Sequence, residues 1–173
     1  IRADRREVAD PDWHGPFDLW DGEWWRVPVN AFHHADVLHL LINCVAAWGL
    51  GSRLERRWGS LRFAIFLLPS IYIPMLAEMV NGNVAVGFSG AICSMLGALI
   101  ALKQFDDDDI LPDQVVQFGV AFLVLGLWAS KLEVMRVANV AHFVGLAYGW
   151  FSTWAMCGPF EMKRSIRGLF LFS

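Results

Sequence analysis

Apolar residues gather in five blocks along the chain, separated by shorter polar stretches. A helix needs about 20 apolar residues to cross the roughly 30 Å hydrocarbon core of a bilayer. Four blocks approach that length and the third is shorter. The predicted spans cover residues 32–55, 61–80, 88–103, 115–132 and 137–157. We therefore expect an all-α, polytopic membrane helix bundle that forms a single domain over residues 1–173.

Composition and charge point to the same environment. Of the 173 residues, 56% are hydrophobic and 18% are charged, whereas about a quarter of the residues of soluble domains are charged. The net charge of −3 argues against nucleic acid as a partner. All three cysteines lie inside or at the end of apolar blocks, which argues against a disulfide framework. The lipid bilayer is the expected partner of a multi-pass integral membrane protein, in the cell membrane if the chain is bacterial.

The polar segments predict an orientation. Residues 1–31 are polar and then rich in tryptophan, as in an outer loop at the membrane interface. The first span ends in a segment with several arginines, between residues 53 and 62, which indicates a cytoplasmic turn. Residues 158–173 carry further basic side chains and are expected to form a cytoplasmic tail. The aspartates at 106–109 are typical of a solvated turn, and neither a metal site nor a cofactor is predicted.

Polar side chains stand where the spans begin on the outer side. His39 and Asn43 are four residues apart and so share one helix face, and His34 lies slightly nearer the surface. Ser89 opens the short span, and His142 lies one turn inside the last one. Polar groups within a bilayer cost several kcal/mol, so these residues are functional candidates.

Small residues predict how two of these spans meet. Stripes of small side chains at every fourth position let membrane helices approach closely. The short span and the last span carry such stripes, and these are Gly90, Ser94 and Ala98 on one and Ala141, Gly145 and Gly149 on the other. If the stripes face each other, Ser89 and His142 come within reach. The alternative is that the stripes serve packing alone.

The chemistry of this pair would be nucleophilic catalysis. A serine hydroxyl becomes a good nucleophile when an adjacent histidine takes its proton. Backbone N–H groups at the helix start beside Ser89 could stabilise an oxyanion, and His39 and Asn43 could add side-chain donors. The last span contains no acid that would complete a Ser-His-Asp triad. The residues therefore predict a Ser89–His142 dyad.

The short span fits this hypothesis. Residues 88–102 would extend only about 23 Å as a helix, too little to cross the hydrocarbon core. The segment before them would have to dip into the membrane, where irregular backbone is tolerated only beside protein or a water-filled cavity. Hydrolysis requires such water.

Taken together, these residues resemble the rhomboid family of intramembrane serine proteases. The resemblance covers nearly the whole chain. It is carried by Trp25 and Arg26, His34, His39 and Asn43, Gly51, Glu55 and Gly59, the GFSG of residues 87–90 with Gly87 and Gly90, and Asn139, His142, Gly145 and Gly149.

The resemblance implies specific roles. Ser89 would be the nucleophile and His142 the general base. His39 and Asn43, with the backbone of Phe88 and Ser89, would form the oxyanion hole. Arg26 and Glu55 match family positions with structural roles. The family cleaves transmembrane protein substrates near the outer membrane face.

The sequence departs from the family pattern in two places. Familiar members place an aromatic residue four positions after the serine, where it stacks on the histidine, and here that position is Cys93. The family core has six spans and this chain shows five, so we expect that the first span of the core precedes Ile1.

Two other functions stay open. A rhomboid-like pseudoprotease would bind membrane proteins without cleaving them, although such proteins usually lack the serine or the histidine. A transporter could use His39 and His142 as a proton relay. It would be expected to carry paired acids within the membrane, and the sequence offers only Glu78 near the end of a span.

Overall fold

The computed structural model describes residues 22, 24–83, 86–106, 110–133 and 137–170. Most of the predicted outer loop, three of the clustered aspartates and the last three residues of the predicted tail lie outside the described residues. The elements described are all helices, which confirms the all-α prediction. They are α2 (Arg26–Asn30), α3 (Val37–Trp58), α4 (Ser60–Val80), α5 (Ser89–Asp106), α6 (Asp113–Lys131) and α7 (Asn139–Phe170).

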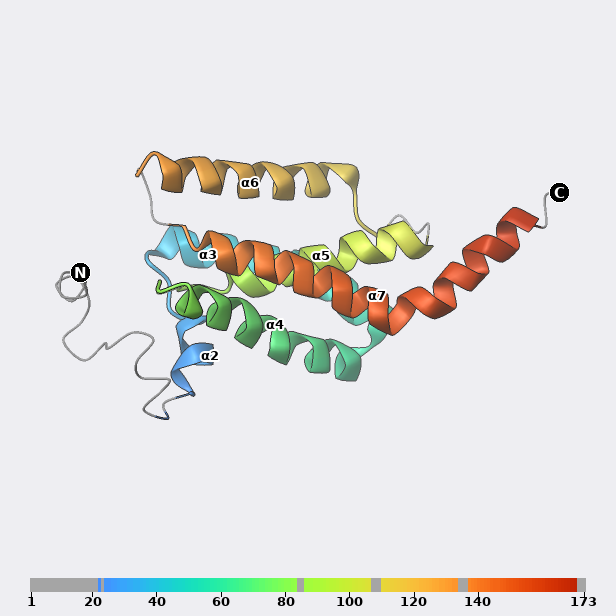
Figure 1. Cartoon of the computed structure of the whole chain (residues 1–173), viewed down its shortest axis with the longest axis horizontal. Helices are drawn as coiled ribbons and strands as arrows, with labels where there is room; N and C mark the ends of the chain where they lie inside the picture. Colours follow the sequence, from blue (N-terminus) through green and yellow to red (C-terminus); the bar gives the residue numbers. More distant parts are fainter. Residues whose placement is uncertain (1–21, 23, 84–85, 107–109, 134–136, 171–173) are drawn as a thin grey trace.

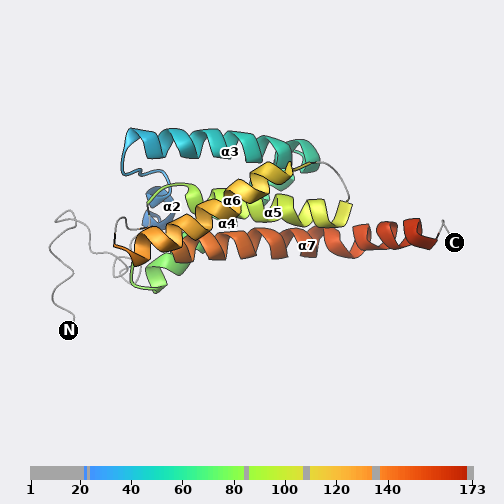
Figure 2. The ribbon, with the colours of Figure 1, turned by 90° about the horizontal axis from the view of Figure 1, so that it is seen from above.

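The helices form a bundle around α5 and α7. These two lie side by side through the middle, with α4 along one flank and α6 along the other (Figure 1). The view from above places α3 on the side of α5 away from α7, with α6 crossing obliquely (Figure 2). α3, α5 and α7 run in one direction, and α4 and α6 run in the other (Figure 1). The starts of the first three and the ends of the other two therefore share one end of the bundle, which we call the site end.

Local sequence explains where the helices begin and end. Asp36 caps α3, since its carboxylate accepts a 2.8 Å hydrogen bond from the His39 backbone N–H. α3 stops at Gly59, whose φ of +81° suits glycine and reverses the chain into α4. Glu55 supports this reversal, because its carboxylate accepts a 2.7 Å hydrogen bond from the Ser60 hydroxyl.

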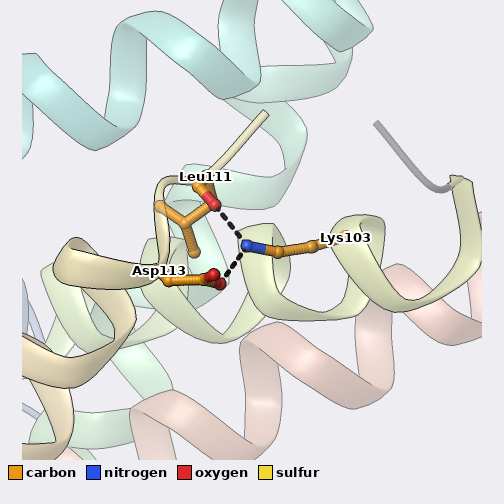
Figure 3. Close-up of polar contacts among 3 residues, drawn as sticks. All are labelled: Lys103, Leu111 and Asp113. Carbon is orange, nitrogen blue, oxygen red and sulfur yellow. Dashed lines mark hydrogen bonds and ion pairs between the residues drawn. The ribbon is translucent and has the colours of Figure 1, made fainter. Parts of the chain in front are cut away.

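At the opposite end, one lysine ties α5 to α6 (Figure 3). Lys103 Nζ donates to the carbonyl oxygen of Leu111 at 2.8 Å and pairs with the Asp113 carboxylate at 2.5 Å. Leu111 itself is fully buried. The lysine thus joins the two sides of the predicted aspartate turn.

Three helices, α3, α4 and α6, are long and apolar enough to cross a membrane. The apolar part of α5 is shorter, over Ser89–Gln104. α7 continues to Phe170, so its helix runs on into the segment expected as a tail. The short helix α2 lies within the segment expected as a loop. The chain is a multi-pass integral membrane protein, as its apolar blocks predicted.

Candidate active site

Ser89 is the first residue of α5, and the turn before it depends on a glycine. Gly87 has a φ of +98°, a conformation that favours glycine. A Cβ at this position would lie 2.8 Å from Cε1 of His39, so a side chain would also collide with that ring. The Gly87 N–H donates to the carbonyl oxygen of Asn30 at 3.1 Å. This turn fixes the point at which the chain enters α5.

His142 meets Ser89 from α7. The Ser89 Oγ lies 2.7 Å from Nε2 of His142, which is hydrogen-bonding distance. The imidazole is buried, with 3% of the residue exposed. Among the described residues, no group pairs with its other nitrogen, Nδ1. The two side chains thus form a serine–histidine pair to which the described residues add no acid.

The close approach of α5 and α7 creates this contact. A methyl group on Gly145 would overlap the carbonyl oxygen of Gly90, and one on Gly149 would overlap that of Ser94. The two stripes of small residues therefore face each other. Gly97, which the stripe pattern did not include, packs in the same way against the Leu146 carbonyl. Backbone lies against backbone along this interface.

His39 and His34 stand beside the turn at Gly87, and Asn43 follows His39 on the same helix. The rings of His34 and His39 meet edge to face with centroids 5.1 Å apart. Asn43 is buried one turn further along α3, and its amide nitrogen donates to the His39 carbonyl at 2.9 Å. Since an amide nitrogen carries two hydrogens, this bond leaves one of them for another acceptor.

Phe88 precedes the serine and packs its half-buried ring against Phe32, with centroids 6.1 Å apart. Its carbonyl oxygen accepts the N–H of Ile92 and so starts the hydrogen bonds of α5. The next residue after Ser89, Gly90, is buried against α4, where a Cβ would lie 2.7 Å from Cβ of Pro74.

The other supporting residues make contacts of their own and none is shown to bond to Ser89 or His142. Asn139 opens α7, and its amide nitrogen donates to the Ser130 hydroxyl at 2.8 Å, which joins α7 to the end of α6. Arg26 is half-buried at the start of α2. Glu55 lies at the other end of the bundle, at the Gly59 reversal.

Two contacts of this site were not predicted from the sequence. The ring of Phe122, on α6, lies 5.3 Å from that of His142, centroid to centroid. Glu78, at the end of α4, accepts the backbone N–H of Ala141 at 2.8 Å, directly before the histidine. Both residues belong to helices other than α7, so no local motif joins them to His142. An acid inside an apolar block was the one available signal for Glu78.

The described residues contain no cluster of metal ligands. Within the described parts of the chain, no group of three or more His, Cys, Asp or Glu side chains could hold a metal ion. Neighbouring His34 and His39 form a pair rather than such a group.

Comparison with known proteins identifies the family. The family model of the Rhomboid domain matches residues 21–159, which is most of the chain. The chain belongs to the rhomboid family. Curated relatives include the rhomboid protease GluP of Bacillus subtilis, 29% identical over 80% of this chain and 27% of the relative. The rhomboid protease GlpG of Serratia proteamaculans is 30% identical over 72% of this chain and 45% of the relative. RHOMBOID-like protein 5 of Arabidopsis thaliana is 29% identical over 76% and 43%. The chain thus spans less than half the length of each of these three relatives.

The Phe122 contact bears on one departure of this chain from the rhomboid pattern. The family pattern that the sequence resembles places an aromatic residue four positions after the serine, and this chain has the buried Cys93 there. Phe122 supplies an aromatic ring to His142 from another helix. The histidine of this rhomboid therefore has an aromatic neighbour in spite of the cysteine.

Proposed function

We propose that this rhomboid is an intramembrane serine endopeptidase that hydrolyses peptide bonds of transmembrane protein substrates. The observation that carries the proposal is the 2.7 Å contact between Ser89 Oγ and His142 Nε2 at the start of α5. A serine activated by an adjacent base is the signature of acyl transfer. Relatives named as rhomboid proteases support the same reaction class.

In the proposed reaction, Ser89 attacks the scissile carbonyl carbon while His142 Nε2 takes the hydroxyl proton. The C–N bond then breaks, and the histidine returns the proton to the leaving amine. Water attacks the acyl-enzyme with the same histidine as base, which releases the carboxylic acid and restores the serine. Because His142 Nε2 lies 2.7 Å from Ser89 Oγ, the hydroxyl proton has a near acceptor.

The oxyanion that forms during attack requires hydrogen-bond donors. The N-terminus of α5 offers backbone N–H groups near Ser89, and in this proposal His39 and Asn43 add side-chain donors. Gly87 is not among them, because its N–H already donates to Asn30. The remaining amide hydrogen of Asn43 suits this role.

A fluorophosphonate probe tests the proposal directly. The purified protein in detergent should be labelled at Ser89, and both Ser89→Ala and His142→Ala should lose the label. Wild-type protein should also cleave a model transmembrane substrate in liposomes, while the Ser89→Ala variant should not. Absence of labelling and cleavage in folded wild-type protein would favour the pseudoprotease alternative.

A further inference from the structure

Glu78 is a buried acid whose two carboxylate oxygens both have partners. Only 2% of the residue is exposed. Its Oε2 accepts the backbone N–H of Ala141 at 2.8 Å, and its Oε1 accepts the side-chain amide of Asn83 at 2.9 Å. Acids are seldom fully buried unless they are paired in this way. Glu78 therefore links the end of α4 to the first turn of α7.

The hydrogen bond to Ala141 satisfies an N–H group in the first turn of α7. The first four N–H groups of a helix have no partner within that helix, and Ala141 carries one of them. An acid at a helix N-terminus is also favoured by the helix dipole. Here the acid comes from another helix, so it fixes where the first turn of α7 lies relative to α4.

His142 is the residue that directly follows this anchor. Its own N–H donates to the Ala138 carbonyl at 3.1 Å, so it belongs to the same first turn. α4 is also in contact with the serine helix, because Pro74 packs against Gly90. The link from Glu78 to Ala141 thus joins the helix that packs against Gly90 to the turn that carries His142.

Asn83 in turn holds the acid. Besides its amide bond to the carboxylate, its backbone N–H donates to the Glu78 carbonyl at 3.1 Å. The side chain of Glu78 is thus held in place by Asn83 as well as by its bond to α7.

We propose that Glu78 is a positioning residue that holds His142 in register with Ser89 through the Ala141 N–H. The proposal rests on the proposed function, since it concerns the geometry of the same pair. Glu78 does not form a triad, because its oxygens bond to Ala141 and Asn83 rather than to the imidazole.

Saturation kinetics of fluorophosphonate labelling at Ser89 separate positioning from binding. Glu78→Leu should lower the maximal labelling rate constant by about 10- to 100-fold, because small displacements of a reacting group have effects of that size. The half-saturating probe concentration should change by less than about threefold, since Glu78 does not line the probe site in this proposal. Glu78→Gln keeps an oxygen that accepts the Ala141 N–H, and the Asn83 amide can turn so that its oxygen accepts from the new NH2 group, so this variant should restore the rate to within about threefold of wild type.

Two further variants keep the test decisive. Ser70→Ala removes a buried hydroxyl from α4. That hydroxyl donates to the Phe66 carbonyl within the same helix, so its loss should leave the rate constant unchanged. Asn83→Ala removes the support of Glu78 and should lower the rate constant by about threefold to tenfold. It decides the question if Glu78→Leu does not yield folded protein.

The proposal is overturned if folded Glu78→Leu labels as fast as wild type, or if Glu78→Gln is as slow as the leucine variant. It is equally overturned if the leucine variant does not fold and Asn83→Ala labels at the wild-type rate. Failure of the proposed function looks different, since folded wild-type protein would then not be labelled at all.

Discussion

The contact of α5 with α7 and the contact of α6 with the rest of the bundle are built in opposite ways. Along α5 and α7, glycines place backbone against backbone, and the α5 residues from Cys93 to Leu99 are all buried. α6 buries only Gly119, Leu123 and Gly126 among its described residues. Its large apolar side chains, such as Phe118 and Leu125, are mostly exposed, and it crosses the bundle obliquely (Figure 2).

The difference indicates which helix interface fixes the positions of Ser89 and His142. Lipid tails are as apolar as leucine, so helices in a membrane associate through close packing and hydrogen bonds rather than through the hydrophobic effect. At the interface that carries Ser89 and His142, glycines bring the two helix backbones into contact. α6 makes polar contacts near its two ends, those of Ser130 with Asn139 and of Lys103 with Asp113, and between them Gly119 packs against the side chain of Leu96 rather than against backbone. It touches the pair through one ring, that of Phe122.

The strongest test of this comparison adds one methyl group to the close interface. In Gly149→Ala, the new methyl would overlap the Ser94 carbonyl oxygen, and neither backbone can move without displacing a whole helix. We expect the free energy of unfolding to fall by about 3 kcal/mol or more. Titration with a denaturing detergent, followed by circular dichroism, measures this change.

Gly49→Ala is the matched control. At this position on α3 the nearest atom to a new methyl would be 3.7 Å away, on the flexible Arg53 side chain. The variant should be as stable as wild type or up to about 1 kcal/mol more stable. If both variants have equal stability, the α5–α7 interface is looser than the geometry indicates.

The positions of the helices could be predicted because the apolar blocks are separated by polar residues. Helix ends were less predictable, since they depend on local caps. α3 begins at Val37 rather than at the predicted residue 32, because Asp36 caps it there. α7 continues beyond the predicted end of its span at residue 157, since an apolar block indicates where a helix is buried in lipid and not where its hydrogen bonding stops.

The juxtaposition of Ser89 with His142 could be predicted because it follows from two stripes on parallel helices. The partners from other elements could not. Phe122 contacts the His142 ring from α6, and Glu78 accepts the Ala141 N–H from α4; their positions depend on how those helices pack, which no local spacing encodes. Gly97 was missed because the predicted register followed positions 90, 94 and 98 alone. The catalytic roles of these residues stay predictions until the labelling experiment is done.

A smaller effect is expected where α6 touches the pair. Phe122→Ala removes the ring beside His142 and leaves the imidazole without its aromatic neighbour. We expect the labelling rate at Ser89 to fall by about 3- to 30-fold, since an aromatic contact of this kind contributes about 0.5–1.5 kcal/mol and lost packing adds to it. Rapid-quench labelling kinetics measure the change.

Phe118→Ala provides the matched control for this ring. Phe118 lies one turn earlier on α6 and is 73% exposed, so its removal should leave the labelling rate within about twofold of wild type. Equal rates for the two variants would contradict a specific role of the Phe122 ring in holding the histidine.

The smallest effect is expected at the far end of α6, where Lys103 holds the turn from α5 (Figure 3). Lys103→Met keeps the length of the side chain but loses both polar contacts, and we expect the free energy of unfolding to fall by about 1 kcal/mol. The side chain of Asp113 is 78% exposed, so the ion pair itself contributes little and is screened by salt. Most of the loss should come from the carbonyl oxygen of the buried Leu111, and Asp113→Asn should therefore cost less than Lys103→Met.

Lys131→Met, at the exposed site end of α6, is the control and should change stability by less than about 0.5 kcal/mol. Because the Lys103 contact lies at the opposite end of the bundle from Ser89, its loss should leave the labelling rate unchanged; a slower rate would show that the ends of α6 are coupled through the helix.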